Sequence, residues 1–173
     1  MADIGIDLGT ATVLVYDSVK GLLIKEPSVV AVDASSGEVL KVGEEAFKMI
    51  GRTPDRIRAL YPLKDGVISD FDQTEQMLRH FLKKASESTL SKPRVCICVP
   101  SGITGVESRA CVNAAVSAGA RKVYLIEEPV AAALGAGLDL SIPRGRFILD
   151  MGGGTTDIAV LSLNGIVCKK SIK

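Results

Sequence analysis

Aromatic residues are scarce in this chain of 173 residues, and tryptophan is absent: phenylalanine and tyrosine together make up 4%. A surface that stacks the bases of a single strand needs such rings, so the composition argues against that kind of binding. The 21 Lys and Arg residues barely exceed the 20 Asp and Glu residues. Without a basic excess to neutralise phosphates, we expect no nucleic-acid partner.

Metal-ligating side chains are also few, because the chain has one histidine and four cysteines. Cys96 and Cys98 alternate within the apolar run Val95–Val99, so both point to the same side of a strand. They cannot complete a tetrahedral zinc site with one histidine, and we interpret them as buried, reduced thiols. No apolar run approaches the roughly 20 residues of a membrane span, and no signal peptide follows Met1. We therefore expect a cytoplasmic protein.

The overall amino-acid composition is typical of a globular protein, with 47% hydrophobic and 24% charged residues. Ile4, Ile6 and Leu8 alternate with small and polar residues and predict a strand, which pairs in a hairpin with residues 13–16. The β-branched run at residues 28–32 predicts the third strand of this antiparallel meander. Residues 33–66 lose this regularity and are too few for a core of their own, so we interpret them as a small inserted subdomain.

The second half of the chain alternates strands with helices. Val95–Val99 and Val123–Ile126 are predicted strands, and Thr104-x-x-Glu107 is a capping box that opens the helix between them. An Ala-rich helix follows at residues 130–134, and a second hairpin includes residues 158–161 and 166–168. A meander followed by this alternation predicts an α/β fold with a mixed sheet and helices packed on it.

Two distant segments repeat one design. Residues Ile6-Asp7-Leu8-Gly9-Thr10-Ala11-Thr12 and Leu149-Asp150-Met151-Gly152-Gly153-Gly154-Thr155-Thr156 each place an Asp near a strand end, before a turn of small residues with Thr. Glycines let main-chain N–H groups turn toward an anion, and Thr hydroxyls add donors. Two such hairpins that face each other could hold a polyphosphate between them. Their two carboxylates would then hold a hydrated Mg²⁺.

Each motif also has a plainer interpretation. A single Asp-x-Gly-Thr segment is a common tight turn, and Gly152–Gly154 could be a flexible joint, but the agreement of the two segments favours a binding site. The phosphate loop G-x-x-x-x-G-K-[ST] and a G-x-G-x-x-G that opens a helix are both missing. Pro129 biases Glu128 away from helical geometry, which places this carboxylate at a strand-to-helix corner. An acidic residue is also favoured at a helix N-terminus for electrostatic reasons alone.

Together these elements resemble the superfamily of actin, sugar-kinase and heat-shock-chaperone ATPases. Asp7–Thr10 is similar to its first phosphate motif, Asp150–Asp157 to its second, and Glu128–Gly137 to its first connecting motif. Within the superfamily the chain resembles the MreB/Mbl family of bacterial rod-shape-determining actin homologues. The stretches that carry this resemblance are Ile4–Ala11, Lys25–Ala31, Met49–Pro54, Lys64–Ile68 and Leu125–Pro129.

The resemblance implies an actin-like, ribonuclease H-like fold. Subdomain IA would comprise residues 1–32 and 67–140, the inserted subdomain IB residues 33–66, and the opening strands of subdomain IIA residues 141–173. The family's adenine-binding motif would lie beyond this chain, so we expect a fragment or a truncated product. Residues 141–173 would then lack the helices that cover them in the family and would pair with another chain or remain mobile.

The resemblance also implies a function. The family consists of nucleotide-dependent, filament-forming cytoskeletal proteins that control rod cell shape and guide cell-wall synthesis at the inner face of the cytoplasmic membrane. It implies ATP, or GTP, bound with Mg²⁺, and as partners further copies of the chain and the cell-wall elongation machinery. Leu90 is the one apolar residue in the loop at residues 86–92, so membrane contact through this loop would be weak.

Site residues follow from the matched motifs. Asp7 and Asp150 would organise Mg²⁺ through water, and Glu128 would position the attacking water with help from Thr155. The phosphate contacts would come from Gly9, Thr10, Ala11, Thr12, Gly152, Gly153, Gly154 and Thr155. The family commonly has Asn where Thr12 stands, and the shorter side chain makes that contact less defined. Hydrolysis is slow in complete members, and we expect this chain by itself to be inactive.

Two other functions remain open. A sugar or acetate kinase of the same superfamily would need a substrate pocket outside this chain. The compact insert at residues 33–66 and Glu128 favour the filament protein over a kinase. A non-catalytic interaction fragment would keep the fold without holding nucleotide tightly.

Overall fold

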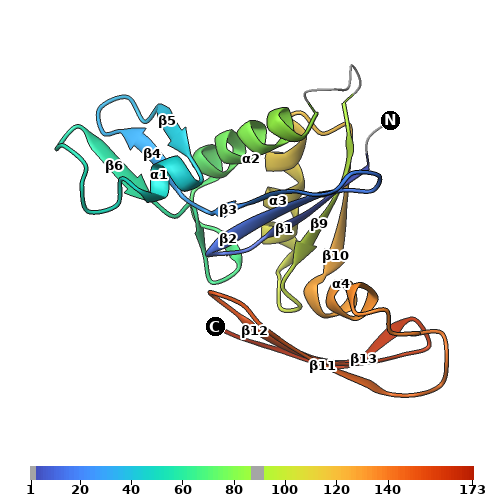
Figure 1. Cartoon of the computed structure of the whole chain (residues 1–173). Coiled ribbons are helices and arrows are strands. Elements are labelled where there is room, and N and C mark those ends of the chain that lie inside the picture. Colours follow the sequence, from blue (N-terminus) through green and yellow to red (C-terminus); the bar gives the residue numbers. More distant parts are fainter. Residues whose placement is uncertain (1–2, 87–91) are drawn as a thin grey trace.

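The computed structural model describes residues 3–86 and 92–173 (Figure 1). Its main sheet has five strands in the order β10-β9-β1-β2-β3. The first three strands along the chain form an antiparallel meander, and the other two run parallel to β1. These strands are β1 (Asp3–Leu8), β2 (Thr12–Asp17), β3 (Gly21–Pro27), β9 (Arg94–Val99) and β10 (Lys122–Glu127).

Two helices cover one face of the main sheet, α2 (Phe71–Ser86) and α3 (Gly105–Ser117) (Figure 1). Alternate residues of β1, β2 and β9 are buried in the core beneath these helices. The predicted α/β fold, with a mixed sheet and helices packed on it, is confirmed. The opposite face of β1 and β9 carries the polar and small residues that line the site described below.

Helix α3 begins at the predicted capping box. Thr104 Oγ1 accepts a hydrogen bond from the Glu107 N–H group at 3.2 Å, and Glu107 Oε2 accepts one from the Thr104 N–H group at 2.7 Å. Thr104→Ala is expected to lower the free energy of unfolding by about 1 kcal/mol, because it removes an N-cap acceptor. Urea denaturation measures this change. Thr104→Ser keeps the hydroxyl group and is the control; equal stability of the two variants would show that the cap contributes nothing.

The prediction of a third meander strand at residues 28–32 was wrong. The third strand is β3, and the chain then enters a separate small sheet through β4 (Val30–Asp33). Val30 and Val32 are buried in the main core, whereas Val29 and Ala31 pack with Ala46 on the other side. An apolar run buried on both sides therefore joins two layers instead of lying at the edge of one sheet.

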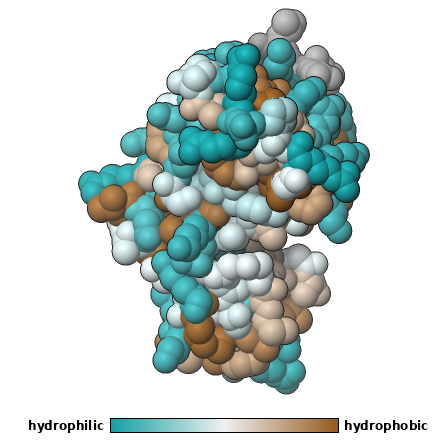
Figure 2. Space-filling view, turned by 90° about the vertical axis from the view of Figure 1, so that its left-hand side faces the viewer, coloured by the Kyte–Doolittle hydropathy of each residue, from teal (hydrophilic) through white to brown (hydrophobic). Residues whose placement is uncertain are grey.

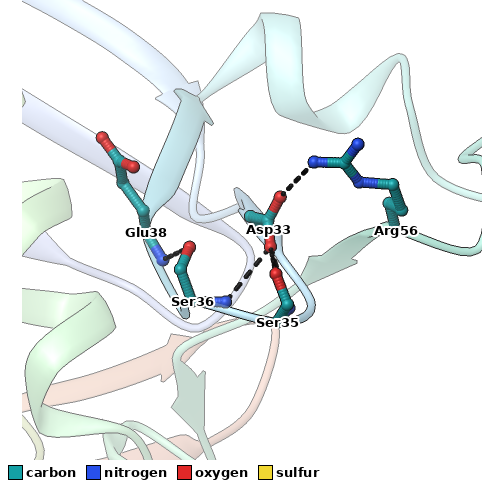
Figure 3. A network of polar contacts seen from close by, with 5 residues as sticks. All are labelled: Asp33, Ser35, Ser36, Glu38 and Arg56. Atoms are coloured by element: carbon teal, nitrogen blue, oxygen red, sulfur yellow. Dashed lines mark hydrogen bonds and ion pairs between the residues drawn. The ribbon is translucent and has the colours of Figure 1, made fainter.

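The small sheet has the order β5-β4-β6, with β5 (Val39–Val42) and β6 (Ile57–Leu60), and carries the short helix α1 (Glu44–Phe47). Asp33 fixes the turn between β4 and β5 (Figure 3). Its Oδ1 accepts hydrogen bonds from the N–H groups of Ser35 at 2.8 Å and Ser36 at 3.1 Å, and its Oδ2 faces Arg56 at 3.4 Å. The hydrogen bonds from Ser35, followed by those from Ser36 and Arg56, hold the pKa of Asp33 well below its ordinary value. This polar cluster therefore has a structural role.

A third, three-stranded sheet lies below the others (Figure 1) and consists of β11 (Arg146–Met151), β12 (Thr156–Ser162) and β13 (Gly165–Ile172). Helix α4 (Glu128–Gly135) covers one face of it, where Ala133 packs with Ala159 and Leu161. The outer face exposes apolar side chains, and Figure 2 shows hydrophobic residues gathered at the bottom of the molecule. These side chains include Phe147, Leu149, Met151 and Ile172. Whether residues 141–173 pair with another chain stays a prediction, as does the division into subdomains.

A two-stranded hairpin links the small sheet to α2. It pairs β7 (Leu63–Lys64) with β8 (Val67–Ile68). Both turn residues have positive φ values, 51° at Asp65 and 74° at Gly66. This conformation is typical of a two-residue hairpin with the sequence Asp-Gly.

No helix in the described ranges 3–86 and 92–173 is long and apolar enough to cross a membrane. The predicted weak membrane contact through Leu90 lies outside the described residues.

Candidate functional site

The two repeated Asp–Gly segments meet at one cavity. Asp7 lies near the end of β1 and Asp150 near the end of β11, so each carboxylate comes from a different sheet. The cavity between them has a volume of about 330 Å³, at the lower end of the range for small-molecule sites. Its lining residues are Asp7, Gly9, Thr10, Ala11, Thr12, Gly66, Cys98, Glu128, Ala131, Ala132, Asp150, Gly152, Gly153, Gly154 and Thr155.

Glycine is required where the two turns touch. A Cβ atom on Gly153 would lie 2.7 Å from the Cβ of Ala11, and one on Gly154 would overlap the side chain of Thr10. Thr10 Oγ1 also accepts a hydrogen bond from the N–H group of Gly66 at 2.9 Å. The turns therefore form a continuous wall of main-chain groups and small side chains, the kind of surface that binds anions.

Glu128 faces the same cavity from the first residue of α4. This helix begins directly after β10 because Pro129, which lacks an N–H group, fits the first helical turn. Burial, followed by the charges of Asp157, Asp7 and Asp150, raises the pKa of Glu128 to about 7. At neutral pH this carboxyl group is thus poised between its protonated and ionised forms.

The two strand-end carboxylates are destabilised in the same way. Burial raises the pKa of Asp7, with a further contribution from Asp150; burial also raises the pKa of Asp150, with a contribution from Asp157. A divalent cation between them would relieve this repulsion. Among residues 3–86 and 92–173, no three His, Cys, Asp or Glu side chains are grouped to hold a metal directly. The two carboxylates beside the glycine turns fit Mg²⁺, which is bound through one or two carboxylates, keeps several waters and takes phosphate oxygens as ligands.

All the residues that the sequence predicted for the site line this one cavity, although their roles stay predictions. Sequence reasoning missed four other lining residues: Gly66, Cys98, Ala131 and Ala132. The Asp-Gly pair at residues 65–66 is a hairpin signal that could have marked Gly66. Cys98 lies opposite Asp7 in the parallel pair of β1 and β9, and burial raises the pKa of its thiol to about 12. It therefore contributes a neutral thiol to the cavity wall.

Two larger hollows in the described part of the molecule lack this combination of carboxylates and glycine turns. One, of about 410 Å³, lies over the main sheet beside Ile4, Tyr16 and Tyr124 and is mostly apolar. The other, of about 790 Å³, lies between α2 and the small sheet, where side chains such as Lys84 and Glu26 already pair, at 2.5 Å. Neither brings strand-end carboxylates beside glycine turns, so the smaller cavity is the candidate site.

Comparison with known proteins yields a family model, described as MreB/Mbl protein, that matches residues 1–173. The chain is 56% identical over 172 residues to "Cell shape-determining protein Mbl" of Bacillus subtilis, covering 99% of this chain and 52% of that protein. It is 50% identical over 177 residues to "Cell shape-determining protein MreB" of Escherichia coli, covering 99% and 51%. The chain thus spans about half the length of the curated relatives it matches.

Among solved structures, MreB5 of Spiroplasma citri bound to ADP superposes with a TM-score of 0.91 at 40% identity. The match covers 99% of this chain and 52% of that one. The predicted actin-like fold is confirmed by this agreement.

Proposed function

Since the chain belongs to the MreB/Mbl protein family, we propose that it carries the phosphate-binding part of a nucleotide-dependent, filament-forming, actin-like cytoskeletal protein. The observation that carries this proposal is the meeting of two Asp–Gly turns, from two different sheets, at one cavity that Glu128 also faces. Such an arrangement suits a triphosphate that is bound between the two turns.

Each group has a proposed task. The main-chain N–H groups of the two turns, with Thr10 and Thr12, would bind the phosphate oxygens. Asp7 and Asp150 would hold a bound Mg²⁺ through its waters, and this ion would neutralise charge that develops on the phosphates. Glu128, when ionised, would orient the attacking water, and Thr155 would assist beside the terminal phosphate. In phosphoryl transfer such positioning and charge stabilisation account for most of the catalysis.

The nucleotide is proposed to be ATP, with GTP as the other candidate. Support comes from the MreB5 structure, which holds ADP in a chain that is 40% identical. The relatives named as cell shape-determining proteins support a role in shape control. We propose that the chain takes part in this role through filaments beneath the cytoplasmic membrane, with the cell-wall elongation machinery as a partner.

Calorimetry with Mg-ATP tests the proposal. We expect heat of binding that disappears when excess EDTA removes Mg²⁺, and Asp150→Asn is expected to weaken binding by at least about 10-fold because an ionised group that holds the cation is lost. Asp139→Asn is the control, since that exposed carboxylate bonds only to the nearby Ser141 in the described structure. Binding that does not depend on Mg²⁺, or no binding, would favour the non-catalytic interaction fragment.

A further inference from the structure

A buried carboxylate that the proposed function leaves without a task lies between two of the sheets. Asp157, near the start of β12, is 1% exposed. Its Oδ1 accepts a hydrogen bond from the N–H group of Ser101 at 2.7 Å, and its Oδ2 accepts one from Ser171 Oγ at 3.3 Å. Ser101 follows β9 of the main sheet, whereas Ser171 belongs to β13. One side chain thus ties the loop after β9 to the sheet that carries the second glycine turn.

The surfaces around Asp157 are in close contact. A Cβ atom on Gly66 would lie 2.6 Å from Pro100 Cγ and 2.9 Å from Thr155 Cγ2. A Cβ atom on Gly102 would lie 3.1 Å from the Cβ of Ser171. We call this close contact, formed by Gly66, Pro100, Gly102, Thr155 and Ser171, the seam. Thr155 is two residues from Asp157 in the chain, so a shift at Asp157 would be passed on to Thr155.

A second polar contact crosses the same boundary, the ion pair between Lys169 Nζ and Glu127 Oε2 at 2.6 Å. Its side chains are 39% and 31% exposed, and pairs so open to water contribute little. The hydrogen bond from the Ser101 N–H group is buried, and a buried donor left without an acceptor is costly. Asp157 therefore provides the stronger polar constraint on how the sheets meet.

We propose that Asp157 is a positioning residue of the phosphate site: by accepting the Ser101 N–H group it sets the distance between the turn at Gly152–Thr155 and the turn at Gly9–Thr12. This inference rests on the proposed function. Neither Asp157 nor Ser101 lines the cavity among the described residues, so the effect is transmitted through the seam.

Charge and position make opposite predictions for variants of Asp157. If its charge were all that mattered, both Asp157→Asn and Asp157→Ala would bind a polyphosphate more tightly, because each removes an anion near the site. If its position matters, Asp157→Ala binds more weakly despite the lost charge. Asp157→Asn keeps an oxygen that can accept the Ser101 N–H group and restores binding.

Binding of Mg-tripolyphosphate to the whole chain, followed by NMR, separates these alternatives. We expect Asp157→Ala to weaken binding by at least about 10-fold, whereas Asp157→Asn stays within about 3-fold of the natural chain or binds more tightly. Ser101→Ala is the matched control, because it leaves the donating main-chain group in place, and it is expected to bind as the natural chain does. Unchanged or tighter binding by Asp157→Ala, or equal loss in both Asp157 variants, would overturn the inference.

Amide hydrogen exchange in the natural chain gives a test that does not depend on the folding of a variant. Mg-tripolyphosphate is expected to slow exchange at Ser101 as well as at the glycine turns, because ligand and seam stabilise each other. Protection of the turns with unchanged exchange at Ser101 would overturn the positioning role and leave the proposed function standing. Protection at neither place would contradict the proposed function itself.

Discussion

Gly66→Ala is expected to lower the free energy of unfolding by about 3 kcal/mol and to disturb both phosphate turns. Gly66 has a φ of 74°, which is strained for any residue with a Cβ atom. The added methyl group would also meet Pro100 Cγ at 2.6 Å and Thr155 Cγ2 at 2.9 Å. The backbone would have to move, which would lengthen the hydrogen bond to Thr10 Oγ1. Urea denaturation measures the stability, and the amide shifts of Thr10 and Thr155 report on the site.

Gly37 offers a matched control for this substitution. It has the same φ of 74°, but no atom lies within 4 Å of the position that a Cβ would take. Gly37→Ala therefore carries the backbone strain alone and is expected to cost about 1 kcal/mol. The difference between the two variants measures the packing at the seam. Equal losses would show that the seam has room for the added methyl group.

Glu128→Gln is expected to stabilise the unliganded chain, by an amount that grows as the pH rises from about 4.5 to about 7. The folded state holds the proton of Glu128 up to a pKa of about 7, whereas the ordinary pKa of this side chain is 4.5. Between these values the folded chain binds more protons than the unfolded chain, so its stability falls as the pH increases. Glutamine does not ionise, so the Glu128→Gln variant does not lose this stability as the pH rises. After allowance for partial solvent screening, we expect a gain of about 1 to 2 kcal/mol at pH 8.

Glu127, the neighbouring residue, provides a control for which the opposite change in stability is expected. Glu127 pairs with Lys169 at 2.6 Å, so Glu127→Gln is expected to lose about 0.5 kcal/mol at neutral pH. Thermal or urea unfolding of both variants at pH 5 and pH 8 tests the contrast. A Glu128→Gln variant that is no more stable than the natural chain at pH 8 would mean that burial and the neighbouring carboxylates do not destabilise the ionised form of Glu128.

Most of the residues that line the candidate site could be predicted from the sequence, because they occur in two contiguous, repeated segments. Strand alternation placed Asp7 and Asp150 at strand ends, and Pro129 placed Glu128 at a corner. The contribution of Gly66 could not be seen in this way, because it depends on a distant hairpin folding back against Thr10 and Thr155. The same holds for Asp157, whose partner is a main-chain group 56 residues away.

The fold was predictable where one face of an element is buried, and less so where both are. The period of two in β1 and the capping box of α3 each specify an element locally. The run at residues 28–32 shows no such period, because its side chains are buried alternately in the main core and beneath α1. Local pattern could not decide which sheet such a strand joins, since tertiary packing makes that choice.

The central claim is that two acidic turns from separate sheets hold one triphosphate with its cation. Mn²⁺ in place of Mg²⁺ tests it directly, because this paramagnetic ion broadens the NMR signals of nearby amides. With Mn-tripolyphosphate, we expect the amides of Gly9–Ala11 and of Gly152–Gly154 to broaden together, while those of Ser35 and Ser36, beside the unrelated carboxylate of Asp33, stay sharp. Broadening confined to one turn, or equal broadening around Asp33, would contradict a shared site.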